Sequence, residues 1–366
     1  MKFMCERSVL LKEIAIAQEI IASKNAISIL SNIFIEADND TLSIKATDLK
    51  VSFETKVPVS VIEAGTATVF GDKFLGILNS VPDGELEFEE ADGKIVIKPA
   101  SKKAKFQLKS IASDKFPDFP APNTDNLFEI PIKDFRDMIR QTIFSVSNDE
   151  TRYFMTGVLL EKKEDLIVMV ATDGRRLALI KKPGAPGVPD FPSIIIPPKI
   201  LQVLMKRSGD EGLVAISITE KMLFISFGSY NLSSLLIEGQ FPNYERVIPE
   251  TQTSSFIVNR EEVLDALKRV SLMVEQKSHR IYCGLSPNTL SIYTEESEIG
   301  TASEEIPCQY EGEEVAIALN YRYIEEPFKV MEDENVSIHF TDTNKAITIK
   351  SDPEKDFFHI VMPMQP

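Results

Sequence analysis

Residues 171–177 read Ala-Thr-Asp-Gly-Arg-Arg-Leu and join two apolar runs, residues 166–170 and 177–180. An Asp-Gly pair between two runs of β-prone residues supplies the positive-φ position of a hairpin turn. Arg175 and Arg176 follow this pair, and arginine keeps its charge at any physiological pH. The stretch therefore predicts a β-hairpin whose tip carries two cations.

A near copy of this stretch lies 125 positions earlier, where residues 46–50 read Ala-Thr-Asp-Leu-Lys after the alternating run 42–45. Strand-like segments open at Phe3, Phe128 and Phe256, which are 125 and then 128 positions apart. The spacing indicates a unit of about 122 residues that occurs three times in the 366-residue chain. Units of this length exceed solenoid repeats, so we expect each to fold around its own core.

Apolar residues recur at helical spacing after each of these strands. The first stripe holds Leu10, Ile14, Ala17 and Ile21, the second Phe135, Met138, Ile139 and Thr142, and the third Val263, Leu267, Val270 and Val274. A second helix is predicted in each unit, opening with a cation at Lys73, Lys199 and Arg322. Pro327 lies inside the last of these helices and is expected to kink or shorten it.

Short alternating strands are predicted between the helices, and proline-rich joints separate the units. The strands cover residues 86–88, 94–97 and 105–108 in the first unit and 213–218, 222–225 and 232–237 in the second. The triplet Phe116-Pro117-Asp118 returns as Phe241-Pro242-Asn243, 125 positions on. We therefore expect an α+β fold of three tandem similar domains, residues 1–124, 125–252 and 253–366.

The composition, 43% hydrophobic and 26% charged residues, is typical of a folded chain. The apolar runs are shorter than the roughly 18 residues that span a bilayer, and the N-terminus lacks a signal-peptide core. We therefore expect a cytoplasmic protein with no membrane partner. Cys5, Cys283 and Cys308 have no Cys-x-x-Cys spacing, so they predict buried thiols in place of a disulfide framework or a zinc site.

The net charge of −16 argues against nucleic-acid binding unless the cations are clustered. The helix windows 8–23, 71–80, 131–145, 197–208, 259–278 and 320–332 hold 14 Lys or Arg and 12 Asp or Glu, so the acidity lies elsewhere. One interpretation is that the windows are solvated helix faces. The other is that the tandem domains form an arc that closes into a ring around a polyanion, although a straight string of domains has the same repeat.

The whole chain resembles the bacterial sliding clamp, the β subunit of the DNA polymerase III holoenzyme. The resemblance rests on residues 171–177, on residues 241–249, which read Phe-Pro-Asn-Tyr-Glu-Arg-Val-Ile-Pro, and on the Met-Pro-Met of residues 362–364. It implies a DNA clamp fold in which two subunits form a homodimeric ring, with helices lining the interior and antiparallel sheets outside. It also implies a non-catalytic processivity factor of DNA replication that needs no cofactor or metal.

The implied ring holds duplex DNA by topology, so its cations should meet phosphates weakly and without sequence readout. Strong negative charge on the rest of the protein disfavours DNA binding outside the channel. The residues selected for DNA contact are Lys24, Lys73, Arg136, Arg140, Arg152, Tyr153, Lys199, Lys206 and Lys268.

The resemblance also implies a pocket that docks short peptide motifs of the polymerase III core, the clamp loader, and other DNA polymerases or repair proteins. The corresponding residues are Met155, Thr172, Gly174, Arg175, Arg176, Leu177, Pro242, Arg246, Val247, Asn320, Tyr323, Ile360, Val361, Met362, Pro363 and Met364. An apolar lining with flexible methionines accepts varied aliphatic or aromatic anchors. The chain departs from the family pattern at Arg175, where histidine is common, and at its Gln365-Pro366 end. The alternative for residues 362–364 is a frayed tail.

Ring closure requires an interface between the first domain of one subunit and the third domain of another. The resemblance places it at Ile77, Lys103, Lys105, Phe106 and Leu108 on one side and Leu272, Met273, Glu298 and Glu304 on the other. The two sides have complementary charge. Lysines on an edge strand also prevent aggregation, which is the alternative interpretation.

Two other classes of function remain open from the residues alone. A hydrolase using Asp173 beside Arg176 is one, although aspartates in repeated turns favour a structural role. The three histidines have no metal-ligand spacing, and the chain lacks Gly-x-Ser-x-Gly and a glycine-rich phosphate loop. The other is a protein scaffold that never encircles DNA.

Overall fold

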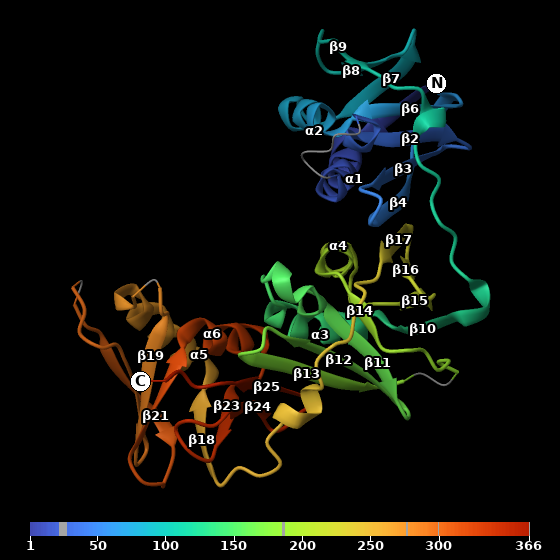
Figure 1. Cartoon of the computed structure of the whole chain (residues 1–366). Helices are drawn as coiled ribbons and strands as arrows, with labels where there is room; N and C mark the ends of the chain where they lie inside the picture. The colour runs from blue at the N-terminus through green and yellow to red at the C-terminus, as the bar shows by residue number, and fades with distance from the viewer. Residues whose placement is uncertain (22–27, 185–186, 276, 299, 366) are drawn as a thin grey trace. The chain divides into compact units, whose positions relative to one another are not determined.

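The computed structural model describes residues 1–21, 28–184, 187–275, 277–298 and 300–365. These residues form two compact units. The first comprises Met1–Lys133, Gly187–Pro189 and Lys199–Leu236, and the second comprises Asp134–Pro186, Asp190–Pro198 and Ile237–Pro366. Figure 1 draws the helices and strands of each unit.

Each third of the chain repeats one order of elements: a strand, a helix and a run of strands, then another strand, helix and run of strands. The first third contains β1 (Lys2–Glu6), α1 (Arg7–Ile20), β2 (Asn32–Asp38), β3 (Thr41–Thr47), β4 (Val51–Pro58), β5 (Ser60–Glu63), β6 (Gly65–Phe70), α2 (Gly71–Ser80), β7 (Glu85–Ala91), β8 (Lys94–Pro99) and β9 (Phe106–Lys109).

The other two thirds follow the same order. The second contains β10 (Leu127–Pro131), α3 (Ile132–Thr142), β11 (Val158–Lys163), β12 (Leu166–Thr172), β13 (Arg176–Pro183), β14 (Ile194–Ile196), α4 (Pro198–Arg207), β15 (Leu213–Ile218), β16 (Met222–Phe227) and β17 (Tyr230–Leu235). The third contains β18 (Ser254–Asn259), α5 (Arg260–Val270), β19 (Arg280–Ser286), β20 (Thr289–Tyr293), β21 (Ser303–Gln309), β22 (Val315–Asn320), α6 (Tyr321–Val330), β23 (Asn335–Phe340), β24 (Ile347–Asp352) and β25 (Phe357–Val361). The repetition confirms the predicted α+β fold of three similar parts in tandem.

The first unit contains two antiparallel sheets and the helices α1, α2 and nearly all of α4, and α1 and α2 pack against each other (Figure 1). A five-stranded sheet has the order β5-β1-β7-β8-β9, and an eight-stranded sheet has the order β10-β15-β16-β17-β4-β3-β2-β6. Leu10 and Ile14 of the predicted stripe on α1 are fully buried, as is Phe74 on α2. The apolar face of each helix therefore forms the core with the sheets.

The second unit contains a twelve-stranded sheet in the order β14-β11-β12-β13-β25-β24-β23-β18-β21-β20-β19-β22. Helices α5 and α6 pack against each other and lie side by side in Figure 1. Asn259 caps α5, because its side chain accepts hydrogen bonds from the N–H groups of Glu261 and Glu262. Val263 and Leu267 of the predicted stripe are buried.

Helix α6 corrects the expectation that Pro327 shortens the third helix of its kind. α6 has ten residues, as α2 and α4 do. Pro327 lies in the second half of α6, and its carbonyl accepts a hydrogen bond from Met331 N–H at 3.1 Å. Proline removes only its own N–H from the helix, so the final turn still closes.

The element ends correct three further sequence expectations. Helix α5 ends at Val270, so Val274 lies beyond it, although it is buried. Because α2 begins at Gly71 and α4 at Pro198, Lys199 corresponds to Asp72 and not to Lys73. Strand β9 begins at Phe106, so the predicted interface residues Lys103 and Lys105 precede the strand.

The three cysteines are free and buried, as predicted. Burial raises the pKa of Cys283 to about 12, so this thiol stays protonated. In the part of the chain that the structure describes, no helix combines the length and apolar character needed to cross a bilayer.

Candidate functional site

The hairpin between β12 and β13 is held by the side chain of Asp173. Its carboxylate accepts hydrogen bonds from the N–H groups of Arg175 at 2.9 Å and Arg176 at 3.1 Å. Gly174 has a φ of 87°, which a residue without Cβ adopts at little cost. Asp48 makes the same turn in the first third, accepting from two backbone N–H groups at 2.9 and 2.7 Å. Both aspartates therefore have the turn role predicted for them.

Strand β13 joins β25 edge to edge in the second unit. Leu177 lies opposite Ile360, and each is 2% exposed. These two predicted pocket residues belong to an apolar cluster of Leu159, Val168, Val170, Leu177, Leu179, Ile195, Tyr244 and Ile360. Phe154, Phe241 and Ile248 pack against this cluster. The predicted pocket therefore has a continuous apolar base, most of which the sequence analysis did not select.

The Arg176 side chain is 10% exposed and fully engaged. Its Nε donates to Asp173 Oδ2 at 3.1 Å, its Nη2 donates to the Phe144 carbonyl at 2.6 Å, and its Nη1 donates to Glu326. The guanidinium lies 4.5 Å from the ring centroid of Tyr323. Arg176 is therefore a rigid wall of the site, whereas Arg175 is exposed at the hairpin tip.

Tyr323 stays a neutral phenol beside this guanidinium. Burial, followed by the negative charge of Asp173, raises the pKa of Tyr323. Asn320 precedes α6 and caps it, accepting a hydrogen bond from Arg322 N–H at 3.0 Å. The cap and the ring contact place the start of α6 beside the β12–β13 hairpin.

The tail after β25 is bound to its neighbours by backbone hydrogen bonds. Met362 N–H donates to the Arg175 carbonyl at 2.9 Å, and Met364 N–H donates to the Ala318 carbonyl at 2.8 Å. The side chain of Met362 is 42% exposed. Residues 362–364 are therefore an ordered edge of the site, which removes the alternative of a frayed tail.

The segment 241–248 borders the same site and is anchored by Tyr244. The Tyr244 hydroxyl donates to Glu161 Oε1 at 2.5 Å and accepts from Lys163 Nζ at 2.7 Å. Lys163 also pairs with Glu245 at 2.5 Å. Burial raises the pKa of Tyr244 to about 12. Pro242 and Tyr244 are among the residues that line a pocket of about 430 Å³.

The remaining predicted pocket residues differ in exposure. Thr172, Met155 and Val361 are buried, whereas Arg246 and Val247 are exposed. Thr172 Oγ1 donates to the Arg176 carbonyl at 2.6 Å, so it braces the hairpin. All sixteen predicted pocket residues belong to the second unit.

Sequence reasoning missed several partners of these residues. Glu326 and Phe144 hold Arg176, and Glu161 and Lys163 hold Tyr244. None of the four lies in a motif, and only Glu161 has the same residue type, Glu36, at the matching position of the first third. Only their contacts in the folded chain identify them.

Many of the cations selected for DNA contact have carboxylate partners. Lys199 Nζ lies 2.7 Å from Asp48 Oδ2 and 2.7 Å from the Ile20 carbonyl. The further ion pairs are Lys73–Asp72 at 3.3 Å, Arg140–Asp137 at 2.7 Å and Lys206–Glu19 at 2.5 Å. Lys268 is exposed, Arg136 is half-buried, and Lys24 lies outside the described residues. Where such a cation is already paired, any phosphate contact must compete with a carboxylate.

Arg152 and Tyr153 lie near the hairpin and not on a helix that carries the other cations. Arg152 Nε pairs with Asp149 at 3.0 Å, and a Cβ added at Gly174 would come within 2.9 Å of Arg152 Nη1. Tyr153 is 52% exposed. These two residues therefore belong to the neighbourhood of the predicted pocket.

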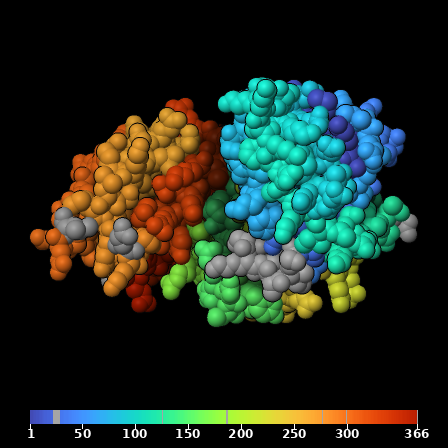
Figure 2. Space-filling view, turned by 90° about the horizontal axis from the view of Figure 1, so that it is seen from above, coloured from blue at the N-terminus to red at the C-terminus, as the bar shows by residue number. Residues whose placement is uncertain are grey.

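One side of the predicted subunit interface lies at a sheet edge. Strand β9 is the terminal strand of its five-stranded sheet, and Phe106 and Leu108 on it are half-buried. Figure 2 shows the teal atoms of the β8–β9 region at the surface of the first unit. Ile77 on α2 is also half-buried.

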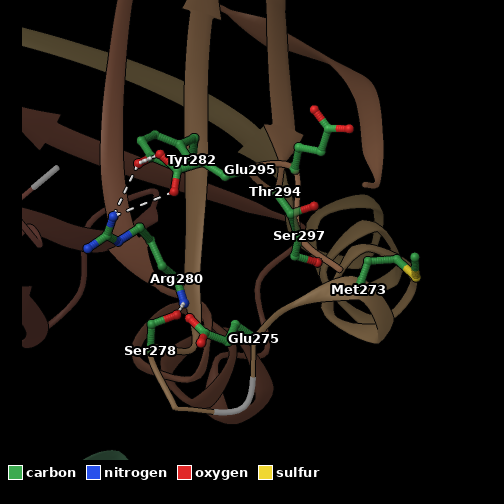
Figure 3. A pocket seen from close by; sticks show the side chains of 9 residues that line it. Met273, Glu275, Ser278, Arg280, Tyr282, Thr294, Glu295 and Ser297 are labelled. Carbon is green, nitrogen blue, oxygen red and sulfur yellow. Dashed lines mark hydrogen bonds and ion pairs between the residues drawn. The ribbon is translucent and has the colours of Figure 1, made fainter. Parts of the chain in front are cut away.

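The other side lies in the third repeat. Leu272 is 77% exposed, and Glu304 pairs with Arg269 at 2.5 Å. Met273 lines a small pocket of about 150 Å³ together with Glu275, Ser278, Arg280, Tyr282, Thr294, Glu295, Glu296 and Ser297. In Figure 3 Arg280 points toward Tyr282 and Glu295, while Met273 lies at the opposite side of the view. Three carboxylates against one guanidinium make this pocket acidic.

Family models match nearly the whole chain. They describe the DNA polymerase III beta subunit: its N-terminal domain at residues 1–120, its central domain at 129–243 and its C-terminal domain at 245–365. The beta sliding clamp of Treponema pallidum is 46% identical over 369 residues, covering 100% of both chains. That of Synechococcus elongatus is 27% identical, covering 100% of this chain and 99% of its own.

Solved structures agree with these relatives. A sliding clamp, DNA polymerase III subunit beta, from Bartonella birtlesii aligns with a TM-score of 0.94 and 26% identity, covering 100% of both chains. The DNA polymerase sliding clamp from Bacillus subtilis aligns with a TM-score of 0.91 and 27% identity, covering 100% of this chain and 99% of its own. The chain therefore belongs to the DNA polymerase III beta subunit family, the sliding clamps, which are non-catalytic processivity factors of DNA replication.

Proposed function

We propose that two copies of this chain close into a cytoplasmic ring around duplex DNA and dock partners at the pocket between the β12–β13 hairpin, β25 and the 362–364 tail. The partners are the polymerase III core, the clamp loader, and other DNA polymerases or repair proteins. The domains of each subunit are residues 1–124, 125–252 and 253–366. The observation that carries this proposal is a strand pairing that repeats within the chain and leaves one pair of strand edges open.

Two strand pairings join different thirds of the chain, and we call them, in chain order, the first and the second junction. β4 pairs with β17, and β13 pairs with β25. In both cases a strand from the first half of one third meets the last strand of the next third. The strands left over are β21 and β9. β9 is terminal in its sheet, and β21 over residues 303–307 pairs only with β20 among the described residues.

The internal junctions predict how β21 of one chain meets β9 of another. In the register of β4 with β17 and of β13 with β25, Ser303 lies opposite Lys105 and Glu305 lies opposite Lys103. Opposite charges directly across a strand pair contribute roughly 0.2–1 kcal/mol each. Leu272, which is 77% exposed in the same third of the chain as β21, supplies apolar surface. Strand register and opposite charge thus favour closure between two chains.

A cysteine pair tests this register. We expect the variant Ser303→Cys with Lys105→Cys to form disulfides between chains, because directly opposed residues place their Cα atoms about 4.5–5.5 Å apart. Non-reducing electrophoresis after mild oxidation measures covalent dimer. Each single variant is the control, since Cys5, Cys283 and Cys308 are buried. Equal dimer from a single variant would contradict the register.

The channel needs only weak contacts to DNA. A sliding ring must not hold one position, so paired and solvated cations suit it better than a continuous basic patch. The chain's net charge of −16 opposes binding of DNA elsewhere on the protein. This combination supports topological retention over direct affinity.

Loading onto a nicked circular plasmid with a clamp loader and ATP tests encirclement. After the plasmid is linearised, the protein should slide off the ends and elute free in gel filtration. On the uncut circle it should stay bound. Retention on linear DNA at the same salt would favour direct binding over a ring.

The pocket is suited to a peptide with apolar anchors. Leu177 and Ile360 supply the apolar base, Met362 supplies an adaptable edge, and Arg246 is an exposed donor at the rim. We expect Arg246→Ala with Met364→Ala, or deletion of residues 362–366, to abolish binding of loader and polymerase motif peptides. Fluorescence anisotropy measures the affinity, and sedimentation checks that the dimer persists. Unchanged affinity would refute the pocket.

A further inference from the structure

A second groove lies at the first junction, where β4 meets β17. Its volume is about 670 Å³. Strands β3, β4, β16 and β17 form its floor and the segment 118–122 forms its wall. The lining side chains are Lys45, Ser52, Glu54, Asp118, Phe119, Pro120, Ala121, Pro122, Phe224, Ser226, Asn231, Leu232 and Ser233. All of them belong to the first unit.

The backbone of this groove repeats that of the proposed peptide pocket. Ser52 lies opposite Ser233 across β4 and β17, as Leu177 lies opposite Ile360 across β13 and β25. Leu235 N–H donates to the Lys50 carbonyl at 2.8 Å, which matches the 2.9 Å bond that anchors the tail after β25. The wall follows Phe116-Pro117-Asp118, the counterpart of Phe241-Pro242-Asn243. The backbone frame that we propose for peptide docking at the second junction is thus also present at the first.

The floor differs in chemistry. Where the second junction has Val170, Leu177, Leu179 and Ile360, the matching positions here are Lys45, Ser52, Glu54 and Ser233. Hydroxyl and charged groups replace four aliphatic side chains. An apolar anchor gains little by entering such a floor, whereas a polar segment finds hydrogen-bonding partners there.

The charges of the groove are unbalanced. Lys45 is already engaged, with Glu54 at 3.4 Å and with the rings of Phe34 and Phe119 at 5.6 and 5.8 Å. Asp118, which is exposed on the wall, has neither an ion pair nor a hydrogen bond within the described parts of the chain. The groove therefore holds one carboxylate with no cation.

We propose that this groove binds an extended, polar peptide segment of a partner protein that places a lysine or arginine on Asp118. The proposal rests on the proposed peptide docking at the second junction, because it transfers that mode of binding to an equivalent frame. Ser52 Oγ lies 3.0 Å from Thr47 Oγ1, and Ser226 Oγ donates to Asn231 Oδ1 at 2.8 Å. Hydroxyl and amide side chains of the segment therefore meet Ser233 and the remaining lone pairs of these two hydroxyls. The basic side chain meets Asp118, beside the Lys45–Glu54 pair.

Three pools of synthetic octapeptides test the proposal on the full-length chain. Seven positions are random mixtures of Ser, Thr, Asn and Gln, and the fourth is fixed as Arg, Leu or Glu. Amide chemical shifts of the isotopically labelled protein report binding at each site, even when affinity is weak. We expect the Arg pool to shift the amides of Ser52, Phe119 and Ser233, and the Leu and Glu pools to shift them at least five-fold less at equal concentration.

The variant Asp118→Asn keeps the shape of the wall and removes its charge. We expect it to weaken binding of the Arg pool at least five-fold, and the matched variant Asp114→Asn to leave it unchanged, since Asp114 does not line the groove. Equal shifts from the Leu pool, no shifts from the Arg pool, or unchanged binding to Asp118→Asn would each overturn the proposal. An apolar motif peptide bound to the same samples reports on the second junction separately, so its failure identifies the proposed function as the error.

Discussion

The two internal junctions of the chain share a backbone and differ in lining. At the second, eight residues form an apolar cluster: Leu159, Val168, Val170, Leu177, Leu179, Ile195, Tyr244 and Ile360. By strand register and linker spacing, the matching positions at the first are Phe34, Ser43, Lys45, Ser52, Glu54, Thr68, Phe119 and Ser233. Only two of these eight are apolar. The two junctions therefore share a backbone frame and differ in the chemistry of the side chains that line it.

The junctions also differ one layer deeper. At the second, His359 Nε2 lies 3.1 Å from Gln141 Oε1, and Gln141 Nε2 donates to the Val330 carbonyl at 3.1 Å. The matching positions at the first junction are Ile16 and Leu232, which are buried. A polar link between α3, α6 and β25 therefore replaces an apolar contact. Such a link fixes one arrangement of the pocket walls, because a buried hydrogen bond is costly to leave unmade.

Exchanging the linings should have the largest effect. We expect Leu177→Ser with Ile360→Ser to lower the free energy of unfolding by about 5 kcal/mol, since each large-to-small change in a core costs about 2–5 kcal/mol. Peptide binding at the second junction should be lost as well. Urea denaturation and fluorescence anisotropy measure the two effects. The matched variant Ser52→Ala with Ser233→Ala at the first junction should change stability by less than about 1 kcal/mol; equal losses in the two variants would contradict the comparison.

Acidification should destabilise the second junction more than the first. Burial, and secondarily the charge of Arg176, lowers the pKa of His359 to about 3, whereas an unfolded histidine titrates near about 6.5. Between these values the unfolded chain binds a proton that the folded chain does not. The free energy of unfolding should therefore fall by about 1.4 kcal/mol for each pH unit below about 6.5, or roughly 2 kcal/mol at pH 5.

Urea unfolding at pH 7, 6 and 5 measures this slope. The variant Gln141→Ile with His359→Leu carries the residues of the first junction and has no buried histidine. We expect its stability to depend less steeply on pH by the amount assigned to His359. If the free energy of unfolding of this variant falls with pH as steeply as that of the unsubstituted chain, a group other than His359 causes the pH dependence.

The sequence predicted the turns and helices that repeat along the chain, and it missed the side-chain contacts that occur in only one third of it. The hairpin of Asp173, its copy at Asp48 and the helical stripes all follow from local patterns, so the structure confirms them. The pairing of Lys73 with Lys199 was wrong by one residue, because periodicity locates a helix without fixing its first residue. Helix α6 continues through Pro327, because the packing of the helix outweighs the low helix propensity of proline.

The candidate site was predictable only where a family motif covers it. Leu177, Tyr323 and Met364 lie in or near such motifs. Glu161, Lys163, Glu326 and Gln141 do not, and they hold the motif residues through contacts between segments distant in the chain. A polar pair that depends on tertiary contact has no local pattern. The same holds for Asp118, whose lack of a partner is visible only in the folded chain.

Tyr244 anchors the linker segment at the second junction, and Phe119 occupies the matching position at the first. The variant Tyr244→Phe therefore gives both linkers the same residue type at this position. We expect a loss of about 1–3 kcal/mol, because Glu161 is buried and loses the donor that lies 2.5 Å from it. Peptide affinity should fall several-fold, since residues 245–248 lose their anchor. Urea denaturation and anisotropy measure the two effects. Phe119→Tyr is the matched control at the first junction, where we expect no gain, because the counterpart of Lys163 there is Asp38.

Lys45→Met should have the smallest effect on stability and a diagnostic effect on binding. The Lys45 side chain is 28% exposed, so its ion pair with Glu54 and its contacts with Phe34 and Phe119 together contribute about 1 kcal/mol or less. Methionine keeps the packing against both rings and leaves Glu54 without a cation. The groove then presents two free carboxylates, so the Arg octapeptide pool should bind more tightly, by two- to five-fold. Weaker binding would mean that Lys45 contacts the segment directly. The difference in peptide preference between the two junctions would then depend on the lysine and not on the carboxylates.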